Sequence, residues 1–316
     1  MKSITIAILG DPLLGSMLAK KGTESDIRFY NSKRKDIALT CVEPFRYPEK
    51  LQSLAFALSM ADAVILTIDK IDQLLGEQII AIDSFGIDHG FIILRNYIQI
   101  DQIRPLIAGT VLERYAYIDP EIHKVNDALP GISPKASEGG FKIPVDHFYN
   151  VKGVGTVALG CVRRGEISQH DEVELFPKGK RGIVRSIQVL DEDTPKAVLG
   201  DRVGIALKGI DIEDVERGCV LAPPGALSSG QNVHVRAIFS KYWKGSIEVG
   251  RLLYAEVGLQ FVSCRIFSVA GDPGSMFQRN ITLQFDSPIA YETGERIVLM
   301  DIDSKGPRVI GHSIIT

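Results

Sequence analysis

The feature that most constrains the fold is a short apolar run near the N-terminus that leads into a turn with two glycines. Residues 4–9 read Ile-Thr-Ile-Ala-Ile-Leu, and Gly10 and Gly15 follow, five positions apart. A continuous apolar run of this length predicts a strand covered on both faces, as in a parallel sheet. Glycines at this spacing between a strand and a helix are typical of a loop that binds phosphate. The opening segment therefore predicts a nucleotide-binding α/β domain.

The same turn lacks the side chains with which such a loop binds a nucleotide. Ser16 and Met17 follow the second glycine, where Lys would neutralise the phosphates and Ser or Thr would bind Mg²⁺. Two lysines lie one turn further on, and a lysine reaching back from there is the alternative. We interpret Gly10 and Gly15 as a residual phosphate loop and expect neither GTP nor Mg²⁺ as a cofactor.

Strand-like and helix-like patterns alternate as far as about residue 130. Apolar runs at 63–68 and 91–94 predict two more buried strands. Apolar residues at helical spacing predict helices near 51–58 and 74–82, and a further helix is expected over 121–129. This part of the chain is predicted to be a doubly wound α/β domain.

The composition changes around residues 130–140, which are rich in Pro, Gly and Ser and indicate a linker. Beyond it no long helical period appears, and short alternating strands separated by glycine turns predict two small closed β-barrels. The predicted fold class is therefore α/β followed by β. The predicted domains are an α/β domain at 1–138, a β-barrel at 139–226 and a second β-barrel at 227–316.

Composition limits the classes of function. The chain of 316 residues is 45% hydrophobic and 24% charged, which is typical of a globular protein. Its net charge of −3 means that any contact with RNA must come from local basic patches. No apolar run is long enough to cross a membrane or to act as a signal peptide. We expect a cytoplasmic monomer with no membrane partner.

Cysteines and histidines indicate neither a metal site nor a catalytic site. The four cysteines are far apart, have no C-x-x-C spacing and lie in apolar stretches, which predicts buried reduced thiols. The six histidines have no metal-ligand spacing, and no Ser/His/Asp arrangement is visible. We therefore expect no bound metal and assign no catalytic residue.

Three segments of the predicted middle domain carry a more specific signal. They read Phe-Lys-Ile-Pro-Val-Asp-His-Phe-Tyr-Asn-Val at 141–151, Gly-Asp-Arg-Val-Gly-Ile at 200–205 and Val-Glu-Arg-Gly-Cys-Val-Leu at 215–221. Together they resemble domain 2 of translational GTPases of the elongation factor Tu and SelB type, and residues 228–316 resemble domain 3. The resemblance is closest to the SelB branch, in particular to the archaeal SelB-like factor associated with pyrrolysine, EF-Pyl. We expect the additional C-terminal RNA-binding domain of SelB to be absent.

The resemblance implies a P-loop-NTPase-like G-domain at the N-terminus, but its other nucleotide motifs also depart from the family pattern. Glu43 stands where the D-x-x-G motif has Asp, and no glycine follows to sense a γ-phosphate. The first switch loop is predicted to have shrunk to about 31–36. The guanine-reading N-K-x-D falls at 95–98, as Arg-Asn-Tyr-Ile, without the carboxylate that would pair with guanine. Phosphoryl transfer depends on such positioning and charge, so a degenerate G-domain with little or no GTP binding or hydrolysis is predicted.

In this family domain 2 carries the pocket for the aminoacyl group at the tRNA 3′ end. By motif its positions fall on Asp146, His147, Tyr149 and Arg202. The resemblance implies that Tyr149 stacks on the terminal adenine or walls the pocket, and that Asp146 accepts the α-ammonium group. Arg202 is a SelB feature, whereas His147 replaces a second SelB arginine, which argues against selenocysteine specificity. The alternative is that Asp146 and Arg202 form a salt bridge at the barrel rim and bind no ligand.

Contacts with RNA phosphates are expected from basic side chains on the same face. The candidates are Lys152, Arg163, Arg164, Lys241 and Lys244. At 241–244 aromatic residues alternate with lysines, which suits an RNA backbone together with stacked bases. The alternative for this segment and for the basic run at 178–181 is a solvated turn.

The sequence therefore predicts a SelB-like elongation factor homologue that binds aminoacyl-tRNA, with the ribosome as a further partner. Two alternatives stay open. One is an active GTPase with a rearranged nucleotide site, and the other is an adaptor for the ribosome or another protein that no longer binds tRNA.

Overall fold

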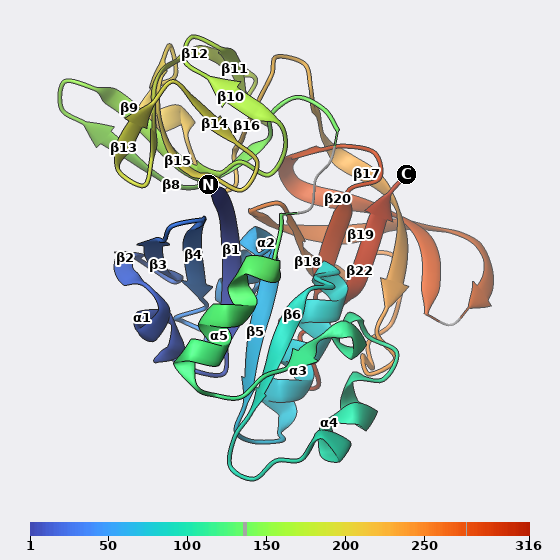
Figure 1. Cartoon of the computed structure of the whole chain (residues 1–316). Coiled ribbons are helices and arrows are strands. Elements are labelled where there is room, and N and C mark those ends of the chain that lie inside the picture. The colour runs from blue at the N-terminus through green and yellow to red at the C-terminus, as the bar shows by residue number, and fades with distance from the viewer. Residues whose placement is uncertain (135–137, 276) are drawn as a thin grey trace.

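An α/β domain followed by two β-barrels makes up the computed structural model, which describes residues 1–134, 138–275 and 277–316 (Figure 1). The prediction of two β-barrels is confirmed. The N-terminal sheet is compatible with the predicted nucleotide-binding type. Part of the predicted linker, residues 135–137, lies outside the described residues.

The sheet of the N-terminal domain has the strand order β2-β3-β4-β1-β5-β6-β7. β1 lies at the centre and pairs in parallel with β4 and β5. β1 and β5 are buried almost throughout, as their continuous apolar runs predicted, and so is β4. The third predicted run lies in β6, which is fully buried only at Ile92 and Ile93. The strands are Lys2–Leu9 (β1), Lys20–Glu24 (β2), Arg28–Lys33 (β3), Ile37–Glu43 (β4), Ala63–Ile68 (β5), Gly90–Leu94 (β6) and Ala116–Tyr117 (β7).

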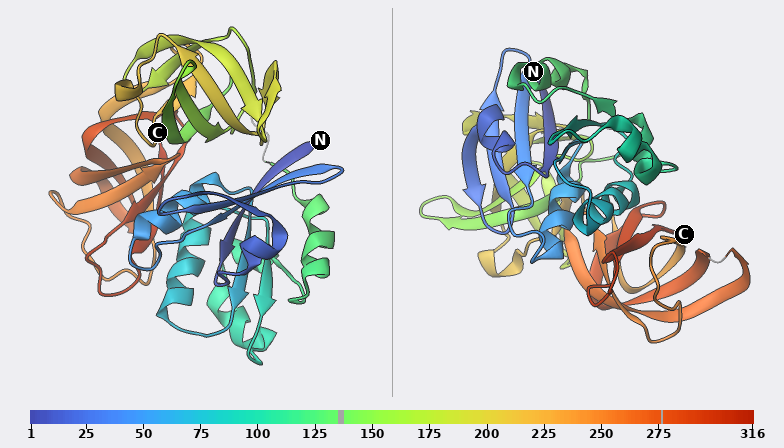
Figure 2. Two further views of the ribbon diagram at one scale, coloured as in Figure 1. Left: turned by 90° about the vertical axis from the view of Figure 1, so that its left-hand side faces the viewer. Right: turned by 90° about the horizontal axis from the view of Figure 1, so that it is seen from below.

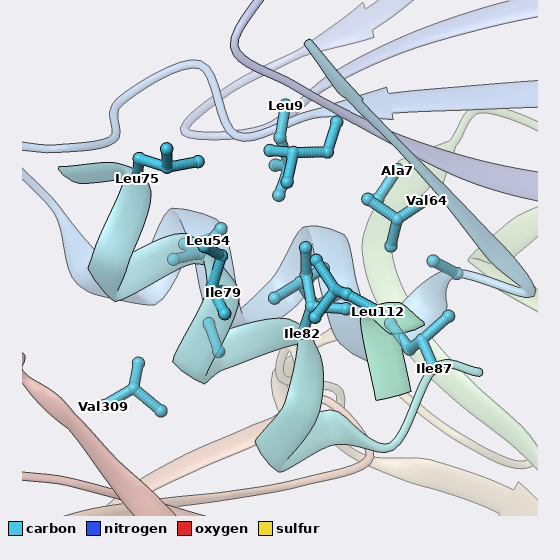
Figure 3. Packing of buried hydrophobic residues seen from close by; sticks show 14 of the residues in the cluster. Ala7, Leu9, Leu54, Val64, Leu75, Ile79, Ile82, Ile87, Leu112 and Val309 are labelled. Atoms are coloured by element: carbon cyan, nitrogen blue, oxygen red, sulfur yellow. The ribbon is translucent and has the colours of Figure 1, made fainter. Parts of the chain in front are cut away.

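Helices cover both faces of this sheet. α2, α3 and α4 pack over Ala7, Leu9 and Val64 on one face (Figure 3). On the other face α1 and α5 pack over Ile6 and Ile8. The helices are Leu14–Leu18 (α1), Leu51–Met60 (α2), Gln73–Phe85 (α3), Ile100–Ile107 (α4) and Ile122–Ala128 (α5), with 3₁₀ turns at Val111–Arg114, Leu129–Gly131 and Ile212–Asp214.

The segment after the phosphate-like turn differs from the prediction. α1 has five residues and ends at Leu18, and the backbone of the next residue, Ala19, is extended. The two lysines that follow therefore lie on strand β2 and not on a second helical turn. β2 forms an antiparallel hairpin with β3 at the edge of the sheet. The first half of the predicted switch loop at 31–36 belongs to β3, and the turn is reduced to 34–36.

The second domain is a closed barrel with a small separate sheet. Its strands follow the order β11-β16-β8-β9-β15-β12, and pairing between β11 and β12 closes the barrel. β13 pairs with β12, and β10 pairs with β14 in the separate sheet. The strands are Ile143–Val151 (β8), Gly155–Cys161 (β9), Glu166–Ser168 (β10), Glu172–Phe176 (β11), Lys180–Val189 (β12), Glu192–Thr194 (β13), Lys196–Val198 (β14), Arg202–Lys208 (β15) and Val220–Ala222 (β16).

The third domain is a second closed barrel, with the order β17-β20-β19-β18-β21-β22. Inward-facing residues alternate with outward-facing ones along its strands, as in β17. The strands are Ser228–Phe239 (β17), Leu252–Val257 (β18), Gln260–Ser275 (β19), Gln278–Tyr291 (β20), Arg296–Met300 (β21) and Val309–Ile315 (β22).

Each domain lies beside the other two (Figures 1 and 2). Ion pairs cross all three interfaces. They include Arg163–Asp62 and Arg217–Asp26 between the first and second domains, Arg308–Glu77 between the first and third, and Arg164–Glu292 between the second and third. The four cysteines are buried and unbridged, as predicted.

Among the helices of the described residues, none combines the length and the apolar character that crossing a membrane requires.

Candidate functional site

The glycines of the phosphate-like turn are required by close packing within the domain. Gly10 has φ +82°, and a side chain there would overlap the carbonyl oxygen of Thr67 in β5. A side chain at Gly15 would overlap the carboxylate of Glu43 and the ring of Tyr30. The spacing that predicted a phosphate loop thus has a structural reason that involves no ligand.

A carboxylate within the turn accepts a hydrogen bond from one of the backbone N–H groups of the loop. Asp11 is 4% exposed, and its carboxylate accepts hydrogen bonds from the Leu13 N–H at 2.9 Å and from the Arg95 guanidinium at 2.6 Å. Arg95 opens the segment that was compared with the guanine-reading motif. The side chain of Asn96 in that segment donates to the Asp69 carbonyl oxygen, and Tyr97 is 97% exposed.

A second carboxylate faces the turn from the end of β4. Glu43 is 5% exposed and accepts a hydrogen bond from the Tyr30 hydroxyl at 3.0 Å, with Arg28 3.6 Å away. Burial raises the pKa of Glu43, against the lowering effects of Tyr30 and Arg28. The space beside Gly15 is therefore filled by an acidic group and an aromatic ring. No cluster of three metal-ligating side chains occurs within the described ranges.

Three of the four predicted aminoacyl-pocket residues meet in one buried cluster on β8 and β15. Arg202 donates to both carboxylate oxygens of Asp146, at 2.5 and 2.8 Å, and His147 Nδ1 lies 2.6 Å from the same carboxylate. A register shift between Val145 and His147 interrupts the alternation of the strand, and Asp146 is buried as well as Val145. Burial alone would raise the pKa of Asp146, but Arg202 outweighs it, so the pKa is lowered and the carboxylate stays ionised.

The β2–β3 hairpin of the N-terminal domain covers this cluster. The Arg202 guanidinium lies 3.9 Å from the centre of the Phe29 ring, which also meets the His147 ring edge-on. Ser25 Oγ lies 3.2 Å from His147 Nε2. The salt bridge of the alternative interpretation is therefore present, but it lies in an interface between domains and not at an open barrel rim.

Arg217 joins the cluster from the second domain. It donates to Asp26 at 2.6 Å, to Ser25 at 3.2 Å and to the Asp146 carbonyl oxygen at 2.9 Å. Arg217 lies in the segment 215–221, which the sequence had already singled out, whereas no local pattern indicated that Ser25 and Asp26 would lie here. Tyr149 lies further along β8 and is 44% exposed.

Two of the predicted phosphate contacts are engaged between domains. Arg163 donates to Asp62 at 2.9 Å and to the Met60 carbonyl oxygen at 3.0 Å. Arg164 forms a bidentate pair with Glu292, at 3.0 and 2.8 Å. In this arrangement both arginines join two domains, and the N–H groups that a phosphate would need are bonded to protein oxygens. Lys152 is exposed near the β8–β9 turn.

The other two predicted phosphate contacts flank a buried tryptophan. Lys241 and Lys244 are exposed in the loop after β17, with the Lys241 ammonium 5.1 Å from the Tyr242 ring. Trp243 stacks on Phe239 and donates to Asp301 at 3.0 Å, so its ring belongs to the barrel core and is not free to stack on a base. The basic run at 178–181 forms surface ion pairs, as the solvated-turn interpretation predicted.

Several known proteins are similar to this chain in sequence. A model of elongation factor Tu domain 2 matches residues 155–222. An uncharacterized protein of Methanocaldococcus jannaschii is 33% identical over 313 residues, which is 98% of this chain and 99% of the relative. The selenocysteine-specific elongation factor of the same organism is 27% identical over 228 residues, which is 64% of this chain and 48% of that factor. The chain belongs to the same family as this uncharacterized protein and contains a domain of the elongation factor Tu domain 2 type. It spans about half the length of that curated selenocysteine factor.

Solved structures of selenocysteine-specific elongation factors share the fold. A bacterial selenocysteine-specific elongation factor, EF-Sec, superimposes on the whole chain with a TM-score of 0.81 at 20% identity, over 58% of its own length. Elongation factor SelB from Methanococcus maripaludis, solved in complex with the GTP analogue GPPNHP, gives a TM-score of 0.82 at 20% identity, over 79% of its length. The arrangement of an α/β domain and two barrels is thus that of SelB.

Proposed function

We propose that this SelB-like protein binds aminoacyl-tRNA through its second domain and binds guanine nucleotide weakly or not at all. The observation that carries the proposal is the contrast between two sites. The phosphate-like turn is faced by Asp11 and Glu43, whereas Asp146, His147 and Arg202 are assembled in the second domain.

Electrostatics supports the nucleotide half of the proposal. A phosphate loop works because free N–H groups and a lysine meet the negative charge of the phosphates. Here the Leu13 N–H is bonded to Asp11, and the Ser16 hydroxyl donates to the Leu13 carbonyl oxygen. A phosphate charge about 4 Å from a carboxylate is repelled by about 4 kcal/mol at the effective dielectric constant near a protein surface. Such repulsion disfavours GTP.

The charge balance of the second-domain cluster bears on the amino acid. Both terminal nitrogens of Arg202 are bonded to Asp146, and Arg217 is paired with Asp26. An anionic side chain would find no unpaired cation among these groups, which argues against selenocysteine. A link with pyrrolysine, as in EF-Pyl, stays a prediction. We propose the ribosome as a further partner and the cytoplasm as the location.

Two titrations on the same sample test the proposal. Calorimetry with GTP and Mg²⁺ is expected to give no binding heat, and charged tRNA is then expected to be protected from hydrolysis of its ester bond. Clear nucleotide binding would restore the alternative of a GTPase with a rearranged site. Absence of protection, together with co-sedimentation with ribosomes, would favour the adaptor.

A matched pair of tyrosine variants tests the site itself. Tyr149→Ala is expected to weaken binding of charged tRNA about tenfold, because stacking on a base contributes about 1–3 kcal/mol. The control is Tyr97→Ala, which removes an even more exposed tyrosine from the N-terminal domain. Equal affinities of the two variants would contradict the role of Tyr149.

A further inference from the structure

Glu256 is a buried carboxyl group between the third domain and the N-terminal domain. Along β18, Leu253, Ala255 and Val257 face the core of the barrel, so Glu256 points outward. It is 1% exposed. Ser59 of α2 faces it from the N-terminal domain. The side chain is thus enclosed because the two domains are docked.

No hydrogen-bond partner compensates for this burial. Within the described ranges, neither carboxylate oxygen of Glu256 meets a donor in hydrogen-bond geometry. The Ser59 hydroxyl is close enough to lower the pKa of Glu256, but its hydrogen bond goes to the Gly258 carbonyl oxygen. An ionised carboxylate left without partners in such a place costs several kcal/mol.

The elements around Glu256 supply little charge. Its partners on the two adjacent strands are Phe261 in β19 and Val298 in β21, both apolar. Arg217 of the second domain is the charged group that acts on Glu256, and its guanidinium is already paired with Asp26. Ser59 is the polar group that α2 contributes.

A protonated carboxyl group resolves the mismatch. Its O–H can donate to Ser59 Oγ while the Ser59 hydroxyl donates to Gly258, which forms a chain of hydrogen bonds from β18 through α2 to the β18–β19 turn. If Glu256 is ionised, the single Ser59 proton can serve either the carboxylate or the Gly258 carbonyl oxygen, but not both. Only the protonated form provides a donor for each link.

We propose that docking of the third domain on the N-terminal domain is linked to protonation of Glu256, which is a neutral acid in the docked arrangement and ionises when the two surfaces separate. Burial raises the pKa of Glu256 well above its ordinary value. Docking is therefore unaffected below the ordinary pKa, and it weakens as pH rises from there toward the raised pKa. The docking equilibrium changes by about tenfold per pH unit within that window.

The variant Glu256→Gln tests the linkage, because Gln imitates the neutral acid and donates a hydrogen bond at every pH. The measurement is equilibrium unfolding of the full chain between about pH 5 and pH 8. Glu256→Gln is expected to be more stable than the wild type, by a margin that grows as pH rises. A variant that is less stable than the wild type at high pH, or a margin that does not change with pH, would overturn the proposal.

Two further measurements make the test specific. Glu77→Gln is the matched control in the same interface, because Glu77 pairs with Arg308 and its pKa is lowered, although burial alone would raise it. It should be less stable than the wild type at neutral pH, opposite in sign to Glu256→Gln. The infrared difference between the wild type and Glu256→Gln at about pH 5.5, which is above the ordinary pKa of Glu, should contain the carbonyl band of a protonated carboxylic acid. Absence of that band would also overturn the proposal.

Discussion

At the scale of single residues, the positions that most resemble a nucleotide site are accounted for by contacts within the domain. Gly10 allows the turn to pass against the backbone of β5, and Gly15 makes room for Glu43 and Tyr30. Arg202 is likewise needed by a neighbour, because it neutralises the fully buried carboxylate of Asp146. Replacing these residues should therefore destabilise the protein, and the loss can be measured without any ligand.

Gly10→Ala is expected to destabilise the protein by about 2 kcal/mol or more, because the new side chain overlaps a carbonyl group and the backbone has positive φ. The control is Gly76→Ala in α3, where an added Cβ meets no atom within 4 Å. It should stabilise the protein by about 0.5–1 kcal/mol. Urea unfolding measures both, and a neutral Gly10→Ala would show that the turn can relax.

Arg202→Ala is expected to cost about 3–5 kcal/mol of unfolding free energy, because it leaves Asp146 charged and buried without its partner. The Arg181 side chain is 73% exposed and lies 3.6 Å from the Glu174 carboxylate, so Arg181→Ala should change stability by less than about 0.5 kcal/mol. Thermal and urea unfolding of the two variants give the comparison. Similar losses for both would mean that the Asp146 site accommodates water when opened.

At the scale of elements, the β2–β3 hairpin matters most, because it brings the N-terminal domain onto the second domain. It places Phe29 against Arg202 and Asp26 against Arg217. The hairpin is an edge element, but Ile27 and Phe29 are buried with Phe56 of α2 and Leu259 of the third domain. It is therefore anchored by apolar contacts as well as by charge.

Asp26→Asn is expected to cost about 1–2 kcal/mol, because it removes the charge from a mostly buried pair with Arg217. Burial alone would raise the pKa of Asp26, but Arg217 outweighs it, and the net shift is downward. The contribution of the pair is therefore present above the ordinary pKa of Asp, about 3.9, and is lost as pH falls through the lowered value.

Unfolding of the wild type and of Asp26→Asn from neutral pH to about pH 3 gives this measurement. The two curves should converge in acid. Lys33→Ala is the control, because Lys33 and Glu192 also join these two domains but are 49% and 68% exposed. A cost for Lys33→Ala as large as that for Asp26→Asn would contradict the importance of burial.

At the scale of the whole molecule, the three domains lie against one another (Figure 2), and ion pairs join each pair of domains. Apolar contacts add to these, since Val298, Met300 and Val309 of the third domain complete the cluster around α2 and α3. Val309 is shown beside this cluster in Figure 3. None of these contacts involves the phosphate-like turn. The closed arrangement therefore has a source of stability that is independent of a nucleotide.

Small-angle X-ray scattering should accordingly give the same radius of gyration with and without GTP and Mg²⁺. The physical reason is that a ligand shifts an equilibrium between arrangements only if it binds them with different affinity. Arg308→Ala is the positive control, because it breaks the pair with Glu77 and should make the chain less compact. A radius of gyration of the wild type that changes with nucleotide would contradict the proposal that the turn binds guanine nucleotide weakly or not at all.

Much of the fold could be predicted because its signals are local. Buried strands at 4–9 and 63–68 and the barrels after residue 140 follow from apolar runs, alternation and glycine turns. The hairpin formed by β2 and β3 could not, since β2 is polar and mostly exposed, and the turn after it pairs with Arg217 of the second domain. In the same way, Arg163 and Arg164 were candidates for phosphate contact until their partners in other domains were known.

By itself the sequence determined the class of each domain and placed Ser16 and Met17 after the second glycine, because residue types and short-range periodicity are visible along the chain. Only the tertiary structure decided what surrounds the phosphate-like turn and what covers the second-domain cluster. Asp11 meets Arg95 across 84 residues, and Arg217 meets Asp26 across 191. Such partners are selected by the packing of whole domains, which no local pattern records.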